Sequence, residues 1–268
     1  MRYGYFDDGN KEYVITDPAT PVPWINYIGD MGFGGFIDQT GGAQLCKDDP
    51  ALGRITKYIP QLPGGMVKGE TLYLRVRYPD GWKIISPYYT PCLDTPDEYE
   101  CRIGCQYVTI RSVIHGIETA VTIFVPPGEN KEVRSIKVRN TFNKRVLVEA
   151  FPFVEFSHFD ALKQLTNADW VPQTMQTEFE GTVSGFHMVR QSAFMHRQTS
   201  VNYFAVSGEL ISYETDRERF LGNNGYADWS RPEAVTAGAC SSRNSLRGNS
   251  IACVHVNLGN LEPGESKE

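Results

Sequence analysis

Acidic residues that stand close together are the first candidates for catalysis in this sequence. Three carboxylate pairs occur, at Asp7/Asp8, Asp48/Asp49 and Glu178/Glu180. Two carboxylates on opposite sides of a glycosidic bond can act as its general acid and base. Neighbouring acids in turns are far more often solvated, and we expect that state for these pairs.

A histidine and an aspartate two residues apart, His158 and Asp160, form the second candidate. Residues two apart in a strand share a face, so the carboxylate could orient the imidazole as a general base. No nucleophile is identifiable beside them, and the sequence therefore does not favour catalysis at this pair.

The glycines between Gly29 and Gly42 are dense enough to suggest a phosphate-binding loop. Their spacing does not match such a loop, and no helical pattern follows them. They predict tight turns and bulges in a sheet instead.

Trp170 is the residue that most strongly suggests ligand binding. It lies with Asn167 and Asp169 in the polar stretch 166–173, which has no hydrophobic period. An aromatic ring can stack on the apolar face of a sugar while a carboxylate and an amide bind its hydroxyls. The alternative is a loop tryptophan folded back onto the sheet, and the sequence leaves both open.

Composition excludes several classes of protein. The 268 residues carry 26 basic and 32 acidic side chains, a net charge of −6, without a basic stripe that could neutralise several phosphates. Nucleic-acid binding is therefore not expected. Charged residues and proline interrupt the longest apolar run, so no membrane-spanning helix is expected. The N-terminus shows no apolar signal segment, and we expect a cytoplasmic protein.

The six cysteines are scattered along the chain without metal-site spacing. Cys101 and Cys105 are four residues apart, and no second pair follows at zinc-finger distance. We expect no metal and no cofactor, and we expect the thiols to be reduced and mostly packed in the core.

Hydrophobic side chains alternate with polar ones at a period of two along much of the chain. The clearest segments are residues 72–77, 108–111, 121–125 and 252–258. Successive side chains of a strand point to opposite faces, so this pattern predicts half-buried antiparallel strands. Turn signals separate them, and only residues 157–167 and 215–221 could hold a helical turn or two. The sequence therefore predicts an all-β fold, one large antiparallel β-sandwich.

The last residues predict a strand that the chain does not complete. The stretch 258–268 reads as a strand, a turn at Pro263 and Gly264, and a polar lead-in to a further strand. We therefore expect residues 1–268 to be a piece of a longer polypeptide, truncated before its last strand.

A series of short segments, in order along the whole chain, resembles one known family. The segments are Phe6-Asp-Asp, Glu12-Tyr-Val-Ile-Thr, Pro21-Val-Pro-Trp-Ile-Asn-Tyr-Ile-Gly29, Thr40-Gly-Gly-Ala43, Arg54-Ile-Thr-Lys-Tyr58, Leu72-Tyr-Leu-Arg75, Phe124-Val-Pro126, Phe153-Val-Glu-Phe156, Arg219-Phe-Leu-Gly222 and Leu261-Glu-Pro-Gly264. The ordered series is much more specific than any single segment. With it, the chain resembles glycoside hydrolase family 94, the cellobiose, cellodextrin, laminaribiose and chitobiose phosphorylases.

The resemblance implies a fold and a reaction. It implies an N-terminal supersandwich domain of the galactose-mutarotase-like kind, followed by a helical linker, an (α/α)6 barrel and a small β-domain that lie outside this chain. The implied reaction is reversible, inverting phosphorolysis of a β-glucoside to α-glucose 1-phosphate and a free sugar, with inorganic phosphate as co-substrate. The general acid and the phosphate-binding residues belong to the barrel, so no catalytic residue is expected in this chain.

The resemblance also implies a role for the stretch that contains Trp170. It implies a homodimer in which a loop after the Phe153–Phe156 strand reaches the partner's acceptor subsite. The corresponding residues here are Thr166, Asn167, Asp169 and Trp170. Cellobiose-type members resemble Thr-Asn-Phe-Gln-Arg at this point, and the departure favours another linkage, such as β-1,3 in laminaribiose, with cellobiose next. The alternatives are a non-catalytic carbohydrate-binding module and a purely structural dimerisation domain.

Overall fold

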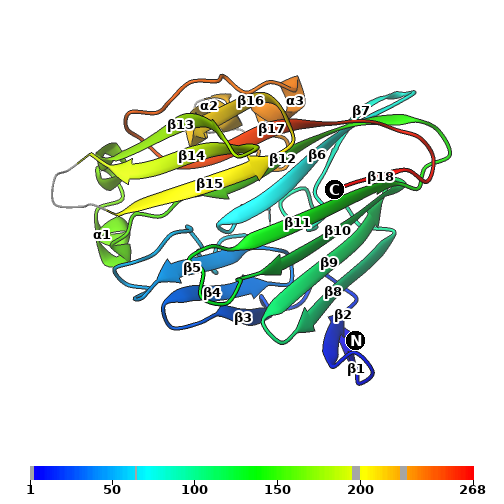
Figure 1. Cartoon of the computed structure of the whole chain (residues 1–268), viewed down its shortest axis with the longest axis horizontal. Helices are drawn as coiled ribbons and strands as arrows, with labels where there is room; N and C mark the ends of the chain where they lie inside the picture. The colour runs from blue at the N-terminus through cyan, green and yellow to red at the C-terminus, as the bar shows by residue number, and fades with distance from the viewer. Residues whose placement is uncertain (1–2, 64, 195–199, 224–227) are drawn as a thin grey trace.

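Strands dominate the structure, a computed structural model that describes residues 3–63, 65–194, 200–223 and 228–268. They form four antiparallel sheets, and the few helices are short (Figure 1). None of the helices in the described ranges is long and apolar enough to cross a membrane. The all-β fold class predicted from the sequence is confirmed.

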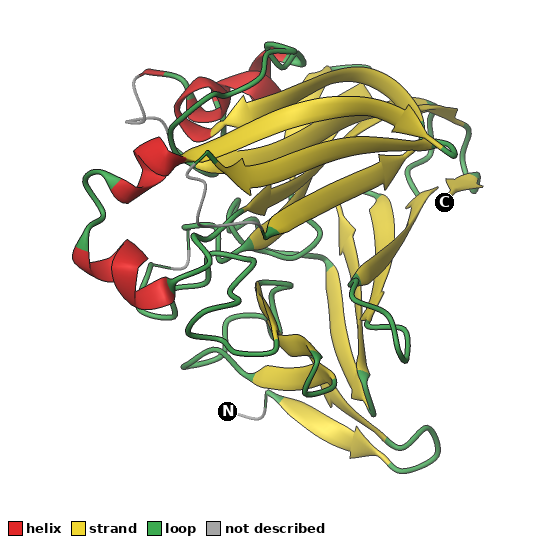
Figure 2. Cartoon of the chain, turned by 60° about the vertical axis from the view of Figure 1, so that its left-hand side comes forward, coloured by secondary structure: helices red, strands yellow, loops and turns green. Residues whose placement is uncertain are grey.

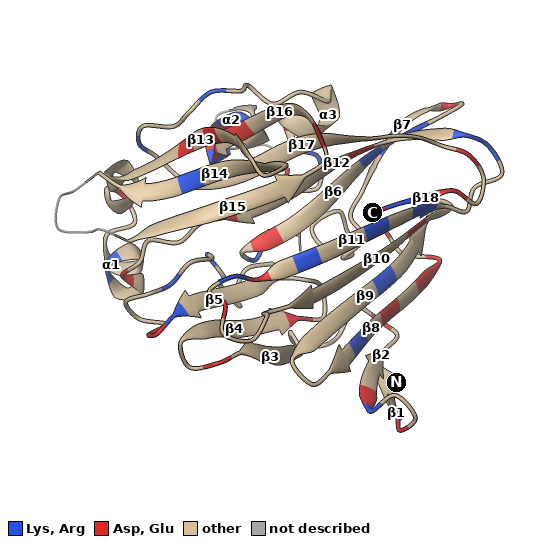
Figure 3. Cartoon of the chain, viewed as in Figure 1, with Lys and Arg blue, Asp and Glu red and all other residues tan. Residues whose placement is uncertain are grey.

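The first sheet has seven strands in the order β1-β2-β8-β9-β10-β11-β18. They are β1 (Gly4–Asp7), β2 (Glu12–Ile15), β8 (Glu98–Gly104), β9 (Tyr107–Ile114), β10 (Ile117–Phe124), β11 (Val133–Asn140) and β18 (Ser266–Lys267). Buried and partly exposed side chains alternate along β9 and β10 because one face lies on the core. The other face carries both signs of charge, paired across strands as in Arg111 with Glu98 and Glu118 (Figure 3).

The second sheet has five strands in the order β16-β17-β12-β6-β7. They are β6 (Glu70–Tyr78), β7 (Gly81–Ile85), β12 (Val146–Glu155), β16 (Glu209–Asp216) and β17 (Ser250–Leu261). Every residue of β12 and nearly every residue of β17 is buried or half-buried. Strands that are apolar on both faces must be covered on both sides.

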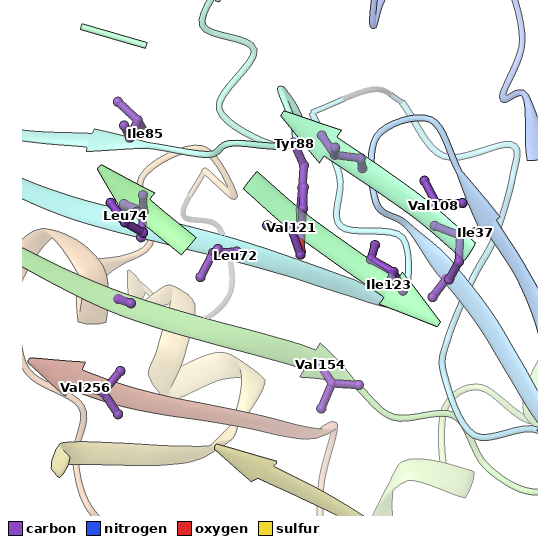
Figure 4. Packing of buried hydrophobic residues seen from close by; sticks show 14 of the residues in the cluster. Ile37, Leu72, Leu74, Ile85, Tyr88, Val108, Val121, Ile123, Val154 and Val256 are labelled. Carbon is purple, nitrogen blue, oxygen red and sulfur yellow. The ribbon is translucent and has the colours of Figure 1, made fainter. Parts of the chain in front are cut away.

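Two hydrophobic clusters supply this cover. On one face the second sheet packs against the first in the main cluster, to which Leu74 and Val256 of the second sheet and Val121 of the first belong (Figure 4). On the opposite face, Phe151 and Phe153 of β12 belong to a second cluster with residues of two short helices. The molecule is therefore a sandwich whose central sheet also has a helical cover.

Two three-stranded sheets complete the main cluster. One consists of β13 (Met175–Val183), β14 (Phe186–Ala193) and β15 (Val201–Ser207), and the other of β3 (Ile25–Gly29), β4 (Phe33–Asp38) and β5 (Ala43–Lys47). Val189 of β14 and Ile37 of β4 are buried members of that cluster. Both small sheets thus extend the same apolar core.

The helices lie to one side of the strands (Figure 2). They are α1 (Ala161–Thr166), the 3-10 helix η1 (Val171–Thr174), α2 (Arg217–Leu221) and α3 (Glu233–Ala237). The sequence predicted helical turns where α1 and α2 occur, but it missed α3. Pro232 and Gly238 bound α3, which is only five residues long, too short for a helical period to be recognised.

After the turn at Pro263 and Gly264, residues Ser266–Lys267 form the short strand β18. It pairs with β11 at two positions, Val138 with Lys267 and Arg139 with Ser266. The turn residues therefore act as the sequence predicted, and they bring residues 266–267 onto the edge of the seven-stranded sheet.

A buried ionic cluster joins β6 to β11. The guanidinium of Arg134 lies 2.8 Å from the Glu70 carboxylate and 2.6 Å from that of Glu132. One nitrogen of Arg134 and one oxygen of Glu132 have no hydrogen-bond partner among the described residues. The pKa of Glu70 is raised to about 8. Burial is the largest cause and Glu132 adds to the rise, whereas Arg134 opposes it. Burial therefore favours the protonated form of Glu70.

The stability of the fold should therefore fall as pH rises from about 4.5 to about 8. In that window the folded chain keeps the Glu70 proton, whereas the unfolded chain releases it near the ordinary value of 4.5. Glu70→Gln should flatten this part of the pH dependence, because glutamine is neutral in both states. Urea unfolding at several pH values measures the effect.

The exposed Glu129 provides the control, and Glu129→Gln should leave the pH dependence of the wild type unchanged. If the free energy of unfolding changed with pH in the same way for the wild type and Glu70→Gln, Glu70 would be ionised in the folded protein between about pH 4.5 and pH 8.

Candidate functional site

The candidate site lies in the connection between β12 and β13, residues 156–174. At its start lies Glu155, the last residue of β12, whose side chain is 7% exposed. Its Oε1 forms ion pairs with Lys57 Nζ at 2.8 Å and with Arg217 Nη1 at 3.3 Å. A buried carboxylate needs such partners, since an unpaired charge is costly away from water. The two cations therefore fix the point at which the chain leaves the sheet.

The inner side of α1 is held by hydrogen bonds to the same connection. Gln164 Oε1 accepts from Ser157 Oγ at 2.5 Å and from the His158 amide at 3.0 Å. Gln191 of β14 donates to the Ser157 carbonyl and accepts from Asn202 of β15. A cavity of about 20 Å³ beside this network has room for one bridging water. Helix α1 is thus anchored to two sheets.

The four predicted site residues lie at the end of α1 and directly after it, and the structure brings them together. Thr166 is the last residue of the helix, Asn167 caps it, and Asp169 and Trp170 lie in the turn before η1. Asn167 Nδ2 donates to Thr166 Oγ1 at 2.8 Å, and Trp170 Nε1 donates to Asn167 Oδ1 at 3.2 Å. Thr166 and Asn167 therefore orient Trp170 within one local turn.

Trp170 is exposed rather than folded back onto the sheet. Its side chain is 45% exposed and belongs to neither core cluster. Lys163 Nζ lies 5.7 Å from the ring centroid, a weak cation–π contact at an exposed site. Asp169 is also exposed, and its carboxylate makes no hydrogen bond within the described residues. An aromatic face and a free acceptor are thus available to a ligand.

Sequence reasoning did not single out two leucines beside this turn. Leu162 and Leu165 of α1 are 69% and 66% exposed. Their spacing of three residues places them on one face of the helix, which was the signal available in the sequence. They add apolar surface to the segment that carries Trp170.

The histidine–aspartate candidate is a structural element. His158 is only 9% exposed, and its Nδ1 accepts the Asp160 amide at 3.0 Å. The Asp160 carboxylate accepts from the Lys163 amide at 2.8 Å and caps α1. Burial lowers the pKa of His158, and Lys163 lowers it further against the effect of Asp160. The two side chains shape the start of α1 and do not form an acid–base pair.

The two N-terminal carboxylate pairs also have local partners. Asp7 accepts from Asn10 and Arg102, which together lower its pKa. Asp49 closes a turn by accepting the Ala51 amide at 2.7 Å. One member of each pair thus holds a local turn, Asp7 through Asn10 and Asp49 through Ala51.

The third pair, Glu178 and Glu180, shares one cation. Arg190 of the neighbouring strand β14 binds Glu178 at 2.7 Å and also contacts Glu180. Such cross-strand pairing on a sheet surface stabilises the pairing of the strands. In the described ranges no group of His, Cys, Asp and Glu could hold a metal ion.

The glycines between Gly29 and Gly42 serve the sheet, as the sequence predicted. A Cβ on Gly35 would stand 1.8 Å from the carbonyl oxygen of Gln44 on β5. Only glycine allows the two strands to approach so closely. A phosphate-binding role has no support there.

Comparison with known proteins places the whole chain in one family. A family model described as the glycosyl hydrolase 94 supersandwich domain matches residues 11–268. The N,N'-diacetylchitobiose phosphorylases of Vibrio furnissii and Vibrio proteolyticus are 31% and 32% identical to it, each over 99% of this chain and 32% of their own length. A 3-O-beta-D-glucopyranosyl-beta-D-glucuronide phosphorylase of Paenibacillus borealis is 27% identical over 98% of this chain and 32% of its own. The chain thus spans about a third of these relatives.

Removal of the Trp170 ring should cost little folding stability. Trp170→Ala should change the free energy of unfolding by less than about 1 kcal/mol, because exposed side chains rarely contribute more. Phe153→Ala is the matched aromatic truncation in the core, where Phe153 is 1% exposed, and should cost about 3–5 kcal/mol. Urea unfolding of both variants compares them. Equal losses of unfolding free energy in the two variants would show that Trp170 is part of the core.

Proposed function

The chain belongs to the glycosyl hydrolase 94 family, and we propose that it is the N-terminal supersandwich domain of a disaccharide phosphorylase. The observation that carries the proposal is the match over residues 11–268, together with relatives that bear phosphorylase names and align over nearly the whole chain. The full-length protein would cleave a β-linked disaccharide with phosphate and release a sugar 1-phosphate with inverted configuration.

The domain supports this reaction without carrying its chemistry. Among the acids considered for catalysis, Glu178 and Glu180 are ion-paired, Asp49 closes a turn and Asp160 caps a helix. None is joined to a phosphate-binding group among the described residues. We therefore assign the general acid and the phosphate site to the part of the protein outside residues 1–268. Inorganic phosphate is the co-substrate, and no other cofactor is proposed.

The segment Thr166–Trp170 is proposed to contact the acceptor sugar of the partner subunit in a cytoplasmic homodimer. Its backbone is anchored through Gln164, whereas the Trp170 ring and the Asp169 carboxylate remain exposed. A rigid base with an open aromatic face suits stacking on a sugar ring, since burial of the apolar sugar face supplies affinity and the carboxylate accepts hydroxyl protons.

Two acceptor classes compete in the proposal. The residues at 168–170 depart from the cellobiose-type pattern and favour a β-1,3 product such as laminaribiose. The 31–32% identity to two diacetylchitobiose phosphorylases favours an N-acetylated sugar instead. We rank the N-acetylated sugar first, because it rests on similarity along the entire chain rather than on three residues.

The full-length protein decides between them in the synthetic direction. Glucose 1-phosphate and N-acetylglucosamine 1-phosphate are offered as donors, each with glucose and with N-acetylglucosamine as acceptor, and phosphate release is followed. Turnover with the N-acetylated pair alone supports the first class, and a β-1,3-linked glucose product supports the second. Sugar binding without any turnover would instead support a carbohydrate-binding module.

Truncation of Trp170 should weaken acceptor use in the full-length protein. Trp170→Ala should lower the acceptor kcat/KM about 10–200-fold, the range for loss of one apolar pocket contact. The KM for the sugar 1-phosphate should stay nearly unchanged, because the donor lies on the other side of the bond. Steady-state kinetics with each substrate varied in turn measure both values.

The exposed Trp82 of β7 gives the control, because it is 38% exposed and lies outside the 156–174 connection. Trp82→Ala should leave the acceptor KM unchanged. Equal kinetic losses in both variants, or none in Trp170→Ala, would refute the acceptor role.

The isolated chain should show no phosphorolysis, because its described residues hold no acid paired with a phosphate cradle. The assay incubates purified residues 1–268 with β-linked disaccharides and phosphate, and the full-length protein is the positive control. Release of a sugar 1-phosphate by the isolated chain would place catalytic residues in this domain.

A further inference from the structure

A cleft opens between α2, α3 and the segment that follows α3. Its volume is about 490 Å³, and Cys240 is among its lining residues. Three glutamates, Glu214, Glu218 and Glu233, line it together with one arginine, Arg219. Arg219 binds Glu214 at 2.9 Å and Arg217 binds Glu218 at 3.1 Å. The exposed Glu233 has no ion-pair partner among the described residues, so it gives the cleft an unpaired negative charge. Cys240 is a partly exposed residue of the cleft lining.

Backbone hydrogen bonds fix Cys240 above the second sheet. The Cys240 amide donates to Ser212 Oγ at 3.0 Å, and the Ser241 amide donates to Glu214 Oε2 at 3.2 Å. Ser212 and Glu214 are residues of β16, so the segment after α3 runs along this strand. Its cysteine is held at a defined place.

A second cysteine lies on the neighbouring strand. Cys253 of β17 stands opposite Glu214 in the β16–β17 ladder and is 0% exposed. Cys240 packs against the second hydrophobic cluster, to which Cys253 belongs. Burial raises the pKa of the Cys253 thiol, and the neighbouring Cys240 thiol raises it further. The two thiols are thus neighbours, one reached from the cleft and one behind it.

We propose that Cys240 and Cys253 form a thiol–disulfide exchange site that takes a small cationic disulfide through this cleft. The Cys240 thiolate attacks one sulfur of the disulfide, forms a mixed disulfide and releases one thiol. Cys253 then attacks Cys240 Sγ, the second small thiol leaves with the Cys253 proton, and a Cys240–Cys253 disulfide remains. One small disulfide is reduced to two thiols while two cysteine thiols are oxidised to one disulfide.

The order of the two cysteines follows from access. Exchange begins at the thiol that the reagent can reach, which is Cys240 in the cleft. Cys253 cannot meet the reagent directly, and the burial that holds it protonated makes the second step the slower one. The mixed disulfide at Cys240 should therefore precede the internal disulfide.

The remaining cysteines do not offer a comparable pair. Cys105 is exposed, Cys101 is buried, and the thiols of Cys46 and Cys92 donate to the carbonyls of Gly34 and Ser230. Cys105 therefore serves as the internal reference for an exposed thiol.

Peptide mapping of the purified chain without reductant tests the site. The reagents are cystamine, a cationic disulfide, and dithiodipropionate, an anionic disulfide of similar size. With cystamine the wild type should yield a cross-linked Cys240–Cys253 peptide, whereas Cys253→Ser should retain the cysteamine adduct on Cys240. In Cys240→Ser, Cys253 should stay unmodified.

Charge selection is read from rates in the same experiment. Cystamine should modify Cys240 several-fold faster than dithiodipropionate after each rate is divided by that at Cys105, and salt should reduce this preference because it screens the glutamates. A ratio of one would overturn the role of the cleft. A lasting adduct on Cys240 in the wild type, or a cross-link from Cys253 to another cysteine, would refute the proposed Cys240–Cys253 disulfide. Both results come from the wild type, so they do not depend on the folding of a variant.

Discussion

The rest of the structure depends on covering the central sheet on both faces. β12 has no exposed residue and β17 has one, so neither face of this sheet can be left to water. The seven-stranded sheet and the two small sheets bury one face in the main cluster, and short helices bury the other. Burial of apolar area is the main favourable contribution to folding. The fold is the arrangement that provides two covers for one sheet.

This constraint also fixes where the polar segments lie. Chain that leaves a doubly covered sheet must do so at the ends of the strands, and its charges need partners there. At the end of β12, Lys57 and Arg217 pair with Glu155. The Lys57–Glu155 pair connects two segments of the family-like series that are distant in sequence, 54–58 and 153–156. Arg217 adds a residue that lies two positions before a third segment, 219–222.

The two proposed sites use different consequences of this arrangement. The Trp170 turn is exposed, but it stands on a hydrogen-bonded base, so its side chains can meet a ligand without loss of the core. The cysteine pair lies where the helical cover meets β16 and β17 and leaves a cleft. In both places the core provides a fixed position, and the surface residue provides access.

The sequence by itself determined the all-β class, most of the strand pattern and the two segments that hold α1 and α2. These depend on local periodicity, because a strand alternates its side chains wherever it lies. The placement of Thr166, Asn167, Asp169 and Trp170 in one polar turn was also local, and the sequence indicated it.

Only the tertiary structure decided which residues meet across long separations. The exposure of Trp170 depends on how α1 and η1 pack, and the sequence left it open between two states. The pairing of Glu70 with Arg134 and the approach of Cys240 to Cys253 join different strands and connections. No local pattern encodes such contacts, because they arise from the packing of whole elements against a shared core.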